Sequence, residues 1–165
     1  KQLHLPDFAD DVIEKVNEAK VPPSKDELEL TEQVFIENIQ SHTRFMHSVC
    51  EYGMSLAIDD FGVGYSSLSY LKNFPVTSLK IDRSFVKDLP ENEDDATITQ
   101  TIISLARNLN IQLVAEGIET EEQVEFLLHR ECATGQGFLF SKPVPAQQVT
   151  QLLQQYNGLI PIQIA

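Results

Sequence analysis

One segment constrains the fold of this chain more than any other: residues 55–70, which read SLAIDDFGVGYSSLSY. It starts as a β-strand, with Leu56 and Ile58 on one face of an extended chain and Ala57 and Asp59 on the other. A second acid follows Asp59 directly, and a loop with two glycines comes next. Unpaired buried charge costs several kcal/mol, so adjacent acids at the end of a buried strand usually have a cation beside them. The segment therefore predicts a strand that delivers carboxylates to a site.

Strand-like and helix-like patterns alternate along the 165 residues. Strands are expected at 27–32, 55–60, 78–82, 112–117 and 133–140, and helices at about 8–19, 34–52, 94–108, 120–129 and 145–156. This alternation favours an α/β fold with a parallel sheet. We expect one domain over residues 1–156 and a C-terminal tail over 157–165.

Charged residues stand near the C-terminal ends of four of these strands: Glu29, Asp59 with Asp60, Lys80 with Asp82, and Glu116. Parallel strands that are buried on both faces are normally apolar throughout. In a (β/α) barrel, however, the inward-facing residues at the C-terminal strand ends form the active site. A barrel would gather these charges at one mouth. An open antiparallel sheet with one wet face stays an alternative, and the long helices between the strands count against it.

The composition of the chain limits which ligands and metals such a site could bind. The net charge of −13, without a cluster of basic residues, argues against binding of DNA or RNA polymers. Cys50 and Cys132 lack a metal-binding spacing, no apolar run is long enough for a bilayer and no signal peptide is visible, so a cytoplasmic setting is expected. Oxygen donors select Mg²⁺, Mn²⁺ or Ca²⁺, and pairs of such ions recur in phosphate-ester cleavage.

One lysine among these acids has two interpretations. Lys80 would bind an anionic oxygen or orient an attacking water if metals neutralise the acids. Alternatively, Lys80 is a structural ion-pair partner of Asp82 or Glu116.

Five motifs together resemble those of the EAL-domain cyclic-di-GMP phosphodiesterases. They are ELTE at 29–32, DDFGVGYSS at 59–67, LKID at 79–82, AEGIE at 115–119 and QGFLFSKP at 136–143. The resemblance implies a modified TIM barrel that hydrolyses cyclic di-GMP to linear pGpG with two Mg²⁺ or Mn²⁺ ions. About the last five strand–helix units of that barrel would be present.

The same resemblance implies roles for individual residues. The metal ligands would be Glu29, Asp59, Asp60 and Glu116, with Asp82 beside the second metal. Lys80 would position or deprotonate the attacking water, with Glu119 and Gln136 supporting it. A regulatory loop between the site and a dimer interface would include Phe61, Gly62, Gly64, Tyr65, Ser66 and Ser67, with Glu32 as its anchor.

The family's Glu-Ala-Leu motif and the strand that supplies a metal-binding Asn are absent from this sequence. We therefore expect this chain to be the C-terminal part of a longer protein, to which sensor, cyclase or membrane segments could belong. By itself it should bind metal weakly and be nearly inactive, and a second copy should cover its open edge as a homodimer or edge-paired oligomer. Three alternatives stay open: a non-catalytic cyclic-di-GMP receptor, an enolase-like enzyme and a pure interaction module.

Overall fold

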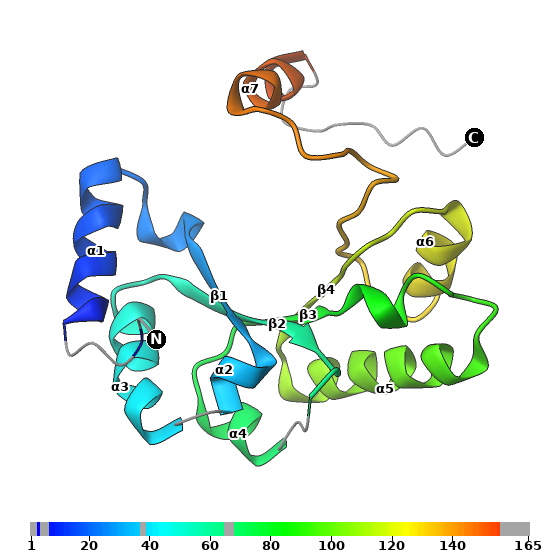
Figure 1. The fold of residues 1–165 in the computed structure, drawn as a ribbon, viewed down its shortest axis with the longest axis horizontal. Coiled ribbons are helices and arrows are strands. Elements are labelled where there is room, and N and C mark those ends of the chain that lie inside the picture. The colour runs from blue at the N-terminus through cyan, green and yellow to red at the C-terminus, as the bar shows by residue number, and fades with distance from the viewer. Residues whose placement is uncertain (1–2, 4–6, 37–38, 65–67, 156–165) are drawn as a thin grey trace.

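The chain is described by a computed structural model that covers all residues except 1–2, 4–6, 37–38, 65–67 and 156–165 (Figure 1). The strands are β1 (Glu27–Thr31), β2 (Ser55–Phe61), β3 (Ser78–Ile81) and β4 (Gln112–Ala115). The α-helices are α1 (Phe8–Ala19), α2 (Glu32–Ile36), α3 (Ile39–Glu51), α4 (Leu68–Asn73), α5 (Glu93–Leu109), α6 (Glu121–Leu128) and α7 (Ala146–Gln155), and the short 3-10 helices are η2 (Pro23–Lys25) and η3 (Arg83–Phe85).

The four described strands form one sheet in the order β1-β2-β3-β4, and every neighbouring pair is parallel. The predicted parallel α/β fold is confirmed, and the antiparallel alternative is wrong. In the described part of the chain, β1 is an edge strand and the sheet does not close into a barrel.

The fifth predicted strand, residues 133–140, does not form as a strand. Only Gly135 makes a parallel bridge, to Ala115 at the end of β4. The segment still follows β4, since the Gln136 amide donates to the Ala115 carbonyl and the Ile118 amide donates to the Gln136 carbonyl. It then turns, with the Phe140 amide donating to the Gly137 carbonyl, which ends the pairing. The prediction was therefore right about the position of this segment and wrong about its secondary structure.

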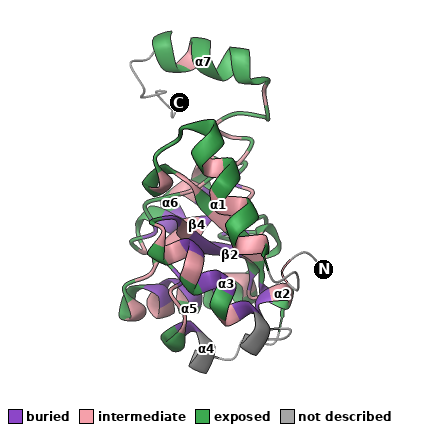
Figure 2. Cartoon of the chain, turned by 90° about the vertical axis from the view of Figure 1, so that its left-hand side faces the viewer, coloured by how far each residue is buried: buried purple, intermediate pink, exposed green. Residues whose placement is uncertain are grey.

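The core lies between the sheet and the helices packed on it (Figure 2). Leu56, Leu79 and Ile81 are completely or almost completely buried. On α5, Ile102 and Ala106 lie four residues apart on a buried apolar stripe, whereas Ile98, one turn earlier, is exposed. Burial of such a stripe is the main stabilising contribution of an amphipathic helix.

Local signals fix the helix ends. The Asn92 side chain accepts hydrogen bonds from the amides of Asp94 and Asp95 and caps α5. Gly53, with φ of 106°, follows α3, where an L side chain would be strained. The single helix predicted at 34–52 is two helices, α2 and α3, which are separated by residues outside the described part.

Helix α7 stands apart from the rest of the fold (Figure 1), and none of its residues is buried. Val149 and Leu153, which lie four residues apart on one side of this helix, are exposed. Among the described residues, no helix is both long enough and apolar enough to cross a membrane.

Candidate metal centre

The register of the sheet places the four predicted charges on one face. Glu29 of β1 lies opposite Ala57 of β2, which in turn lies opposite Ser78 of β3. Residues opposite each other in parallel strands point to the same face, and so do residues two apart within one strand. Asp59, two residues beyond Ala57, and Lys80, two residues beyond Ser78, therefore share this face. Glu116 joins them because Val114 lies opposite Lys80.

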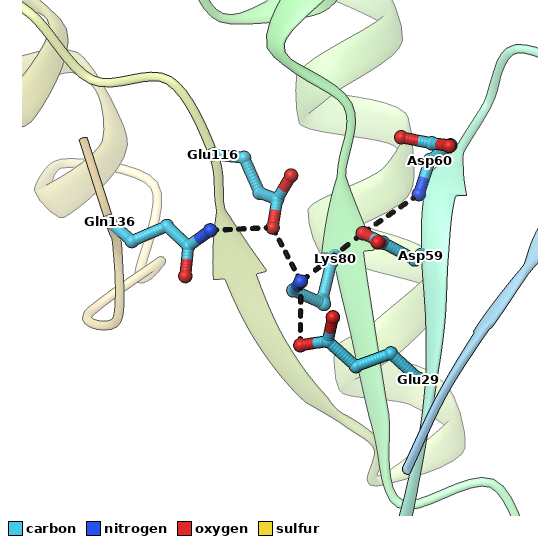
Figure 3. Close-up of polar contacts among 6 residues, drawn as sticks. All are labelled: Glu29, Asp59, Asp60, Lys80, Glu116 and Gln136. Atoms are coloured by element: carbon cyan, nitrogen blue, oxygen red, sulfur yellow. Dashed lines mark hydrogen bonds and ion pairs between the residues drawn. The ribbon is translucent and has the colours of Figure 1, made fainter. Parts of the chain in front are cut away.

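The Lys80 ammonium lies at the centre of this group (Figure 3). Its Nζ is 2.7 Å from Glu29 Oε1, 2.7 Å from Glu116 Oε1 and 3.2 Å from Asp59 Oδ1. The Lys80 side chain is only 7% exposed, whereas that of Glu29, on the edge strand, is 48% exposed. Three strands thus direct carboxylates at a lysine on the fourth, and no strand supplies the site alone.

These carboxylates determine the charge of Lys80. Burial alone would lower its pKa, but hydrogen bonds to Glu116 and Glu29 outweigh burial and raise the pKa well above its usual range. Lys80 therefore stays protonated as long as no other cation neutralises these acids. The alternative interpretation of Lys80 as an ion-pair partner of Glu116 describes this contact correctly.

An irregularity in β2 brings two adjacent acids to the same place. In a regular strand, Asp59 and Asp60 would point to opposite faces. The register between β2 and β3 shifts between Ile58 and Phe61, and Asp60 has a left-handed backbone with φ of 53°. Carboxylate oxygens of Asp59, Asp60 and Glu116 consequently lie within 4.8 Å of one another. A bulge at this point re-aims a side chain, as bulges beside functional sites commonly do.

The pKa of Asp60 is raised by partial desolvation and then by the negative charges of Asp59 and Asp82. Burial likewise raises the pKa of Glu116, and the Lys80 ammonium opposes that shift only in part. Both effects are typical of carboxylates crowded together without enough positive charge. A bound cation would relieve this repulsion.

Glu32, the predicted anchor, binds the loop after β2 through its buried carboxylate. It is 3% exposed, and its Oε2 accepts hydrogen bonds from the amides of Gly62 at 2.9 Å and Gly64 at 3.1 Å. A Cβ on Gly64 would lie 3.1 Å from the Glu32 carboxyl carbon, so a side chain there would require Glu32 or the loop to shift by a few tenths of an ångström.

The other predicted residues surround this group at different distances. Gln136 Nε2 donates to Glu116 Oε1 at 2.8 Å. Asp82 faces Asp60, but its Oδ1 also accepts from the Ser84 amide and caps η3. Glu119 is turned toward Arg83, with 2.7 Å between its Oε1 and Arg83 Nη2.

Of the predicted regulatory loop, Phe61 lies in the core instead, and three residues are outside the described part of the chain. Phe61 is 4% exposed and belongs to the core at the end of β2. Tyr65, Ser66 and Ser67 lie outside the described residues.

A cavity of about 590 Å³ opens beside Glu116 and Gln136. Arg83, Phe138 and Lys142 line it, and sequence reasoning assigned them no role. Lys142 Nζ lies 5.8 Å from the centre of the Phe138 ring. The available signal was their position: Arg83 directly follows the LKID motif, and Phe138 and Lys142 belong to QGFLFSKP. They add two cations and an aromatic face next to the acidic group.

Comparison with known proteins agrees with these motifs. Residues 1–143 match the EAL domain family. The chain belongs to the EAL domain family. This EAL domain is 44% identical over 131 residues to the cyclic di-GMP phosphodiesterase NbdA of Pseudomonas aeruginosa, an alignment that covers 79% of the chain and 17% of NbdA. The chain thus spans less than a fifth of the length of this relative.

Solved EAL structures share its fold. The crystal structure of the EAL domain of Mycobacterium smegmatis DcpA superposes with a TM-score of 0.89 at 41% identity, over 97% of this chain and 71% of that one. Klebsiella pneumoniae BlrP1, in a complex with manganese and cy-diGMP, superposes with a TM-score of 0.80 at 33% identity, over 86% of this chain and 36% of that one. The sheet of this EAL domain is therefore part of a TIM-barrel-type architecture.

Proposed function

We propose that this EAL domain belongs to a phosphodiesterase that hydrolyses cyclic di-GMP to linear pGpG by a two-metal mechanism. The observation that carries the proposal is the convergence of Glu29, Asp59 and Glu116 on Lys80 at the C-terminal ends of parallel strands. The named activity of NbdA and the ligands of BlrP1 support the same substrate.

The residues present fit a divalent cation. Asp59, Asp60 and Glu116 offer hard oxygen donors that already lie within reach of one ion. Glu29 would complete the group, and Asp82 would face a second ion from beside Asp60. We propose Mg²⁺ or Mn²⁺ as the native metal, which would supply charge neutralisation and activation of water when bound.

The chain's own residues would then act on the substrate. Lys80 carries a proton and donates hydrogen bonds, so it is suited to hold an attacking water or a phosphate oxygen. Its raised pKa favours positioning over proton abstraction unless bound cations compensate the acids. Gln136 fixes Glu116 through the bond to Oε1, and Glu119 holds Arg83 at the rim of the cavity.

We further propose that this chain by itself turns over cyclic di-GMP slowly. Glu29 lies on an edge strand and is half exposed, so one wall of the site is open in the described part of the chain. A second copy would cover this edge. Near-normal turnover by a homogeneous sample would contradict the first statement, and strictly monomeric sedimentation at high concentration would contradict the second.

The test of function is chromatographic detection of pGpG after incubation of the chain with cyclic di-GMP and Mn²⁺. The wild type should form pGpG slowly, and Lys80→Met should form none. Lys87→Met removes an exposed lysine of equal charge and should leave the rate unchanged. Equal rates for wild type and Lys80→Met would refute the proposal, and saturable cyclic di-GMP binding without any product would indicate a non-catalytic receptor.

A further inference from the structure

The side chain of Gln123 makes more contacts than a helix cap requires. It stands in the first turn of α6 and is 2% exposed. In the capping box, Thr120 Oγ1 accepts from the Gln123 amide, and Gln123 Oε1 accepts from the Thr120 amide at 3.0 Å. Oε1 also accepts from the Glu119 amide at 2.7 Å, and Nε2 donates to the Lys87 carbonyl at 2.8 Å. The last two bonds are not part of a capping box.

These two extra bonds join the loops that carry the site. Lys87 follows η3 in the loop after β3, the strand that holds Lys80. Glu119 belongs to the loop after β4, which begins with Glu116. The Gln123 amide group thus accepts from one loop and donates directly to the other.

Among the described residues, two other polar links join these loops, and only one of them lies as far from the sheet as Gln123 does. Near the sheet, the Glu116 amide donates to the Ile81 carbonyl at 3.2 Å. Farther out, Arg83 pairs with Glu119, but their side chains are 58% and 43% exposed, and an exposed ion pair is weak. Buried hydrogen bonds fix geometry more firmly because breaking one leaves a polar group without water. Away from the sheet, the buried bonds of Gln123 therefore connect the two loops more rigidly than the exposed Arg83–Glu119 pair does.

We propose that Gln123 is a positioning residue for the metal centre: it sets the spacing between the β3 and β4 loops, and so holds Glu116 against Lys80. This inference rests on the proposed function for its consequence in metal binding. The geometric part, a fixed spacing between two loops, can be measured without metal.

Substitution of Gln123 by glutamate separates the link from the cap. Q123E retains acceptor oxygens for the amides of Glu119 and Thr120, and glutamate is a normal residue of a capping box. It loses the donor to the Lys87 carbonyl and places a carboxylate against that oxygen. The matched control, T120A, removes the side-chain acceptor that caps the Gln123 amide but leaves both extra bonds of Gln123.

The experiment measures two quantities on the full chain at pH 8. The first is amide hydrogen exchange of Glu116 by NMR, relative to Leu79 in the core. The second is Mn²⁺ affinity by electron paramagnetic resonance. Q123E should raise the exchange ratio and weaken Mn²⁺ binding roughly tenfold, at the low end of what outer partners of a metal site contribute. T120A should lower global stability and change neither quantity.

Unchanged values in Q123E, or equal changes in T120A, would overturn the inference. If Q123E does not fold, Q123A is scored in the same way, because it also lacks the Nε2 donor. A wild-type chain that binds no Mn²⁺ would contradict the proposed function, and the exchange ratio alone would then decide whether Gln123 sets the loop spacing.

Discussion

Lys80 shows how a single side chain can be determined by its surroundings. It is almost fully buried, and it is stable there only because three carboxylates accept its hydrogen bonds. The carboxylates in turn depend on Lys80, because like charges this close repel one another. The residues that form this ion pair are therefore the same residues that we propose for catalysis.

Replacement of Lys80 by methionine should destabilise the metal-free chain. The substitution leaves Glu116 and Asp59 partly buried without a cation, and breaking a buried pair typically costs about 3–5 kcal/mol. Because Glu29 is half exposed, we expect a smaller loss, about 2–3 kcal/mol, in urea unfolding with EDTA. Lys87→Met is the control and should lie within about 0.5 kcal/mol of wild type. A Lys80→Met chain as stable as that control would show that the acids do not need the cation.

The residue types of the site could be predicted from sequence because acids and a lysine break the apolar pattern of buried strands. Their contacts could not. No pattern indicates that Asp60 adopts a left-handed backbone and so turns toward the same ion site as Asp59. The bond from Gln123 to the Lys87 carbonyl spans 36 residues and follows from the fold alone.

At the scale of elements, the loop after β2 depends on its glycines. Gly62 has φ of 104°, and a Cβ there would lie 2.9 Å from Phe85 Cε2 and 3.1 Å from Ile102 Cδ1. Gly53 has nearly the same φ, 106°, but a Cβ there would be no nearer than 3.6 Å to another atom, in Pro23. The two positions share backbone strain and differ in crowding.

Gly62→Ala should therefore destabilise the chain more than Gly53→Ala. The left-handed backbone costs an L residue about 1–2 kcal/mol at either position. Overlap with Phe85 and Ile102 should add about 1–3 kcal/mol at Gly62 alone. Denaturant midpoints measure the difference, and Mn²⁺ affinity should fall only in Gly62→Ala. Equal losses in both variants would mean that the loop has room to shift.

Element types were predictable where periodicity is strong, as in β1 to β4 and α5. The segment at 133–140 was not, because Gly135 and Gly137 lie so close to Ile118 that a side chain at either position would overlap it, and this contact is set by the fold. The segment makes one bridge to β4, and the described sheet offers no strand on its far side. Helix α7 was predicted from the helical spacing of its apolar residues, but that spacing does not indicate what these residues pack against.

On the scale of the whole molecule, the sheet is protected unevenly. All four residues of β3 are buried, and β3 has a strand on each side. The edge strand β1 has no buried residue, and only β2 pairs with it in the described chain. Local opening follows burial and hydrogen bonding, so the edge should open without the centre.

Hydrogen exchange should reveal this gradient. The β3 amides should exchange only through global unfolding, whereas the β1 amides that pair with β2 should exchange at least tenfold faster, which corresponds to about 1.4 kcal/mol. NMR exchange at low protein concentration measures both in one sample. Uniform protection across β1 and β3 would show that another part of the chain, or a second copy, already covers the edge.

The most direct test of the central claim is Mn²⁺ titration, followed by electron paramagnetic resonance, of variants that each neutralise an acid on a different strand. Glu29→Gln, Asp59→Asn and Glu116→Gln should each weaken Mn²⁺ binding roughly tenfold or more. Glu27→Gln, which removes the same charge two residues before Glu29, should leave the affinity close to wild type. If no variant changes the affinity, or if Glu27→Gln weakens it as much as the others, the strands do not converge on a metal site.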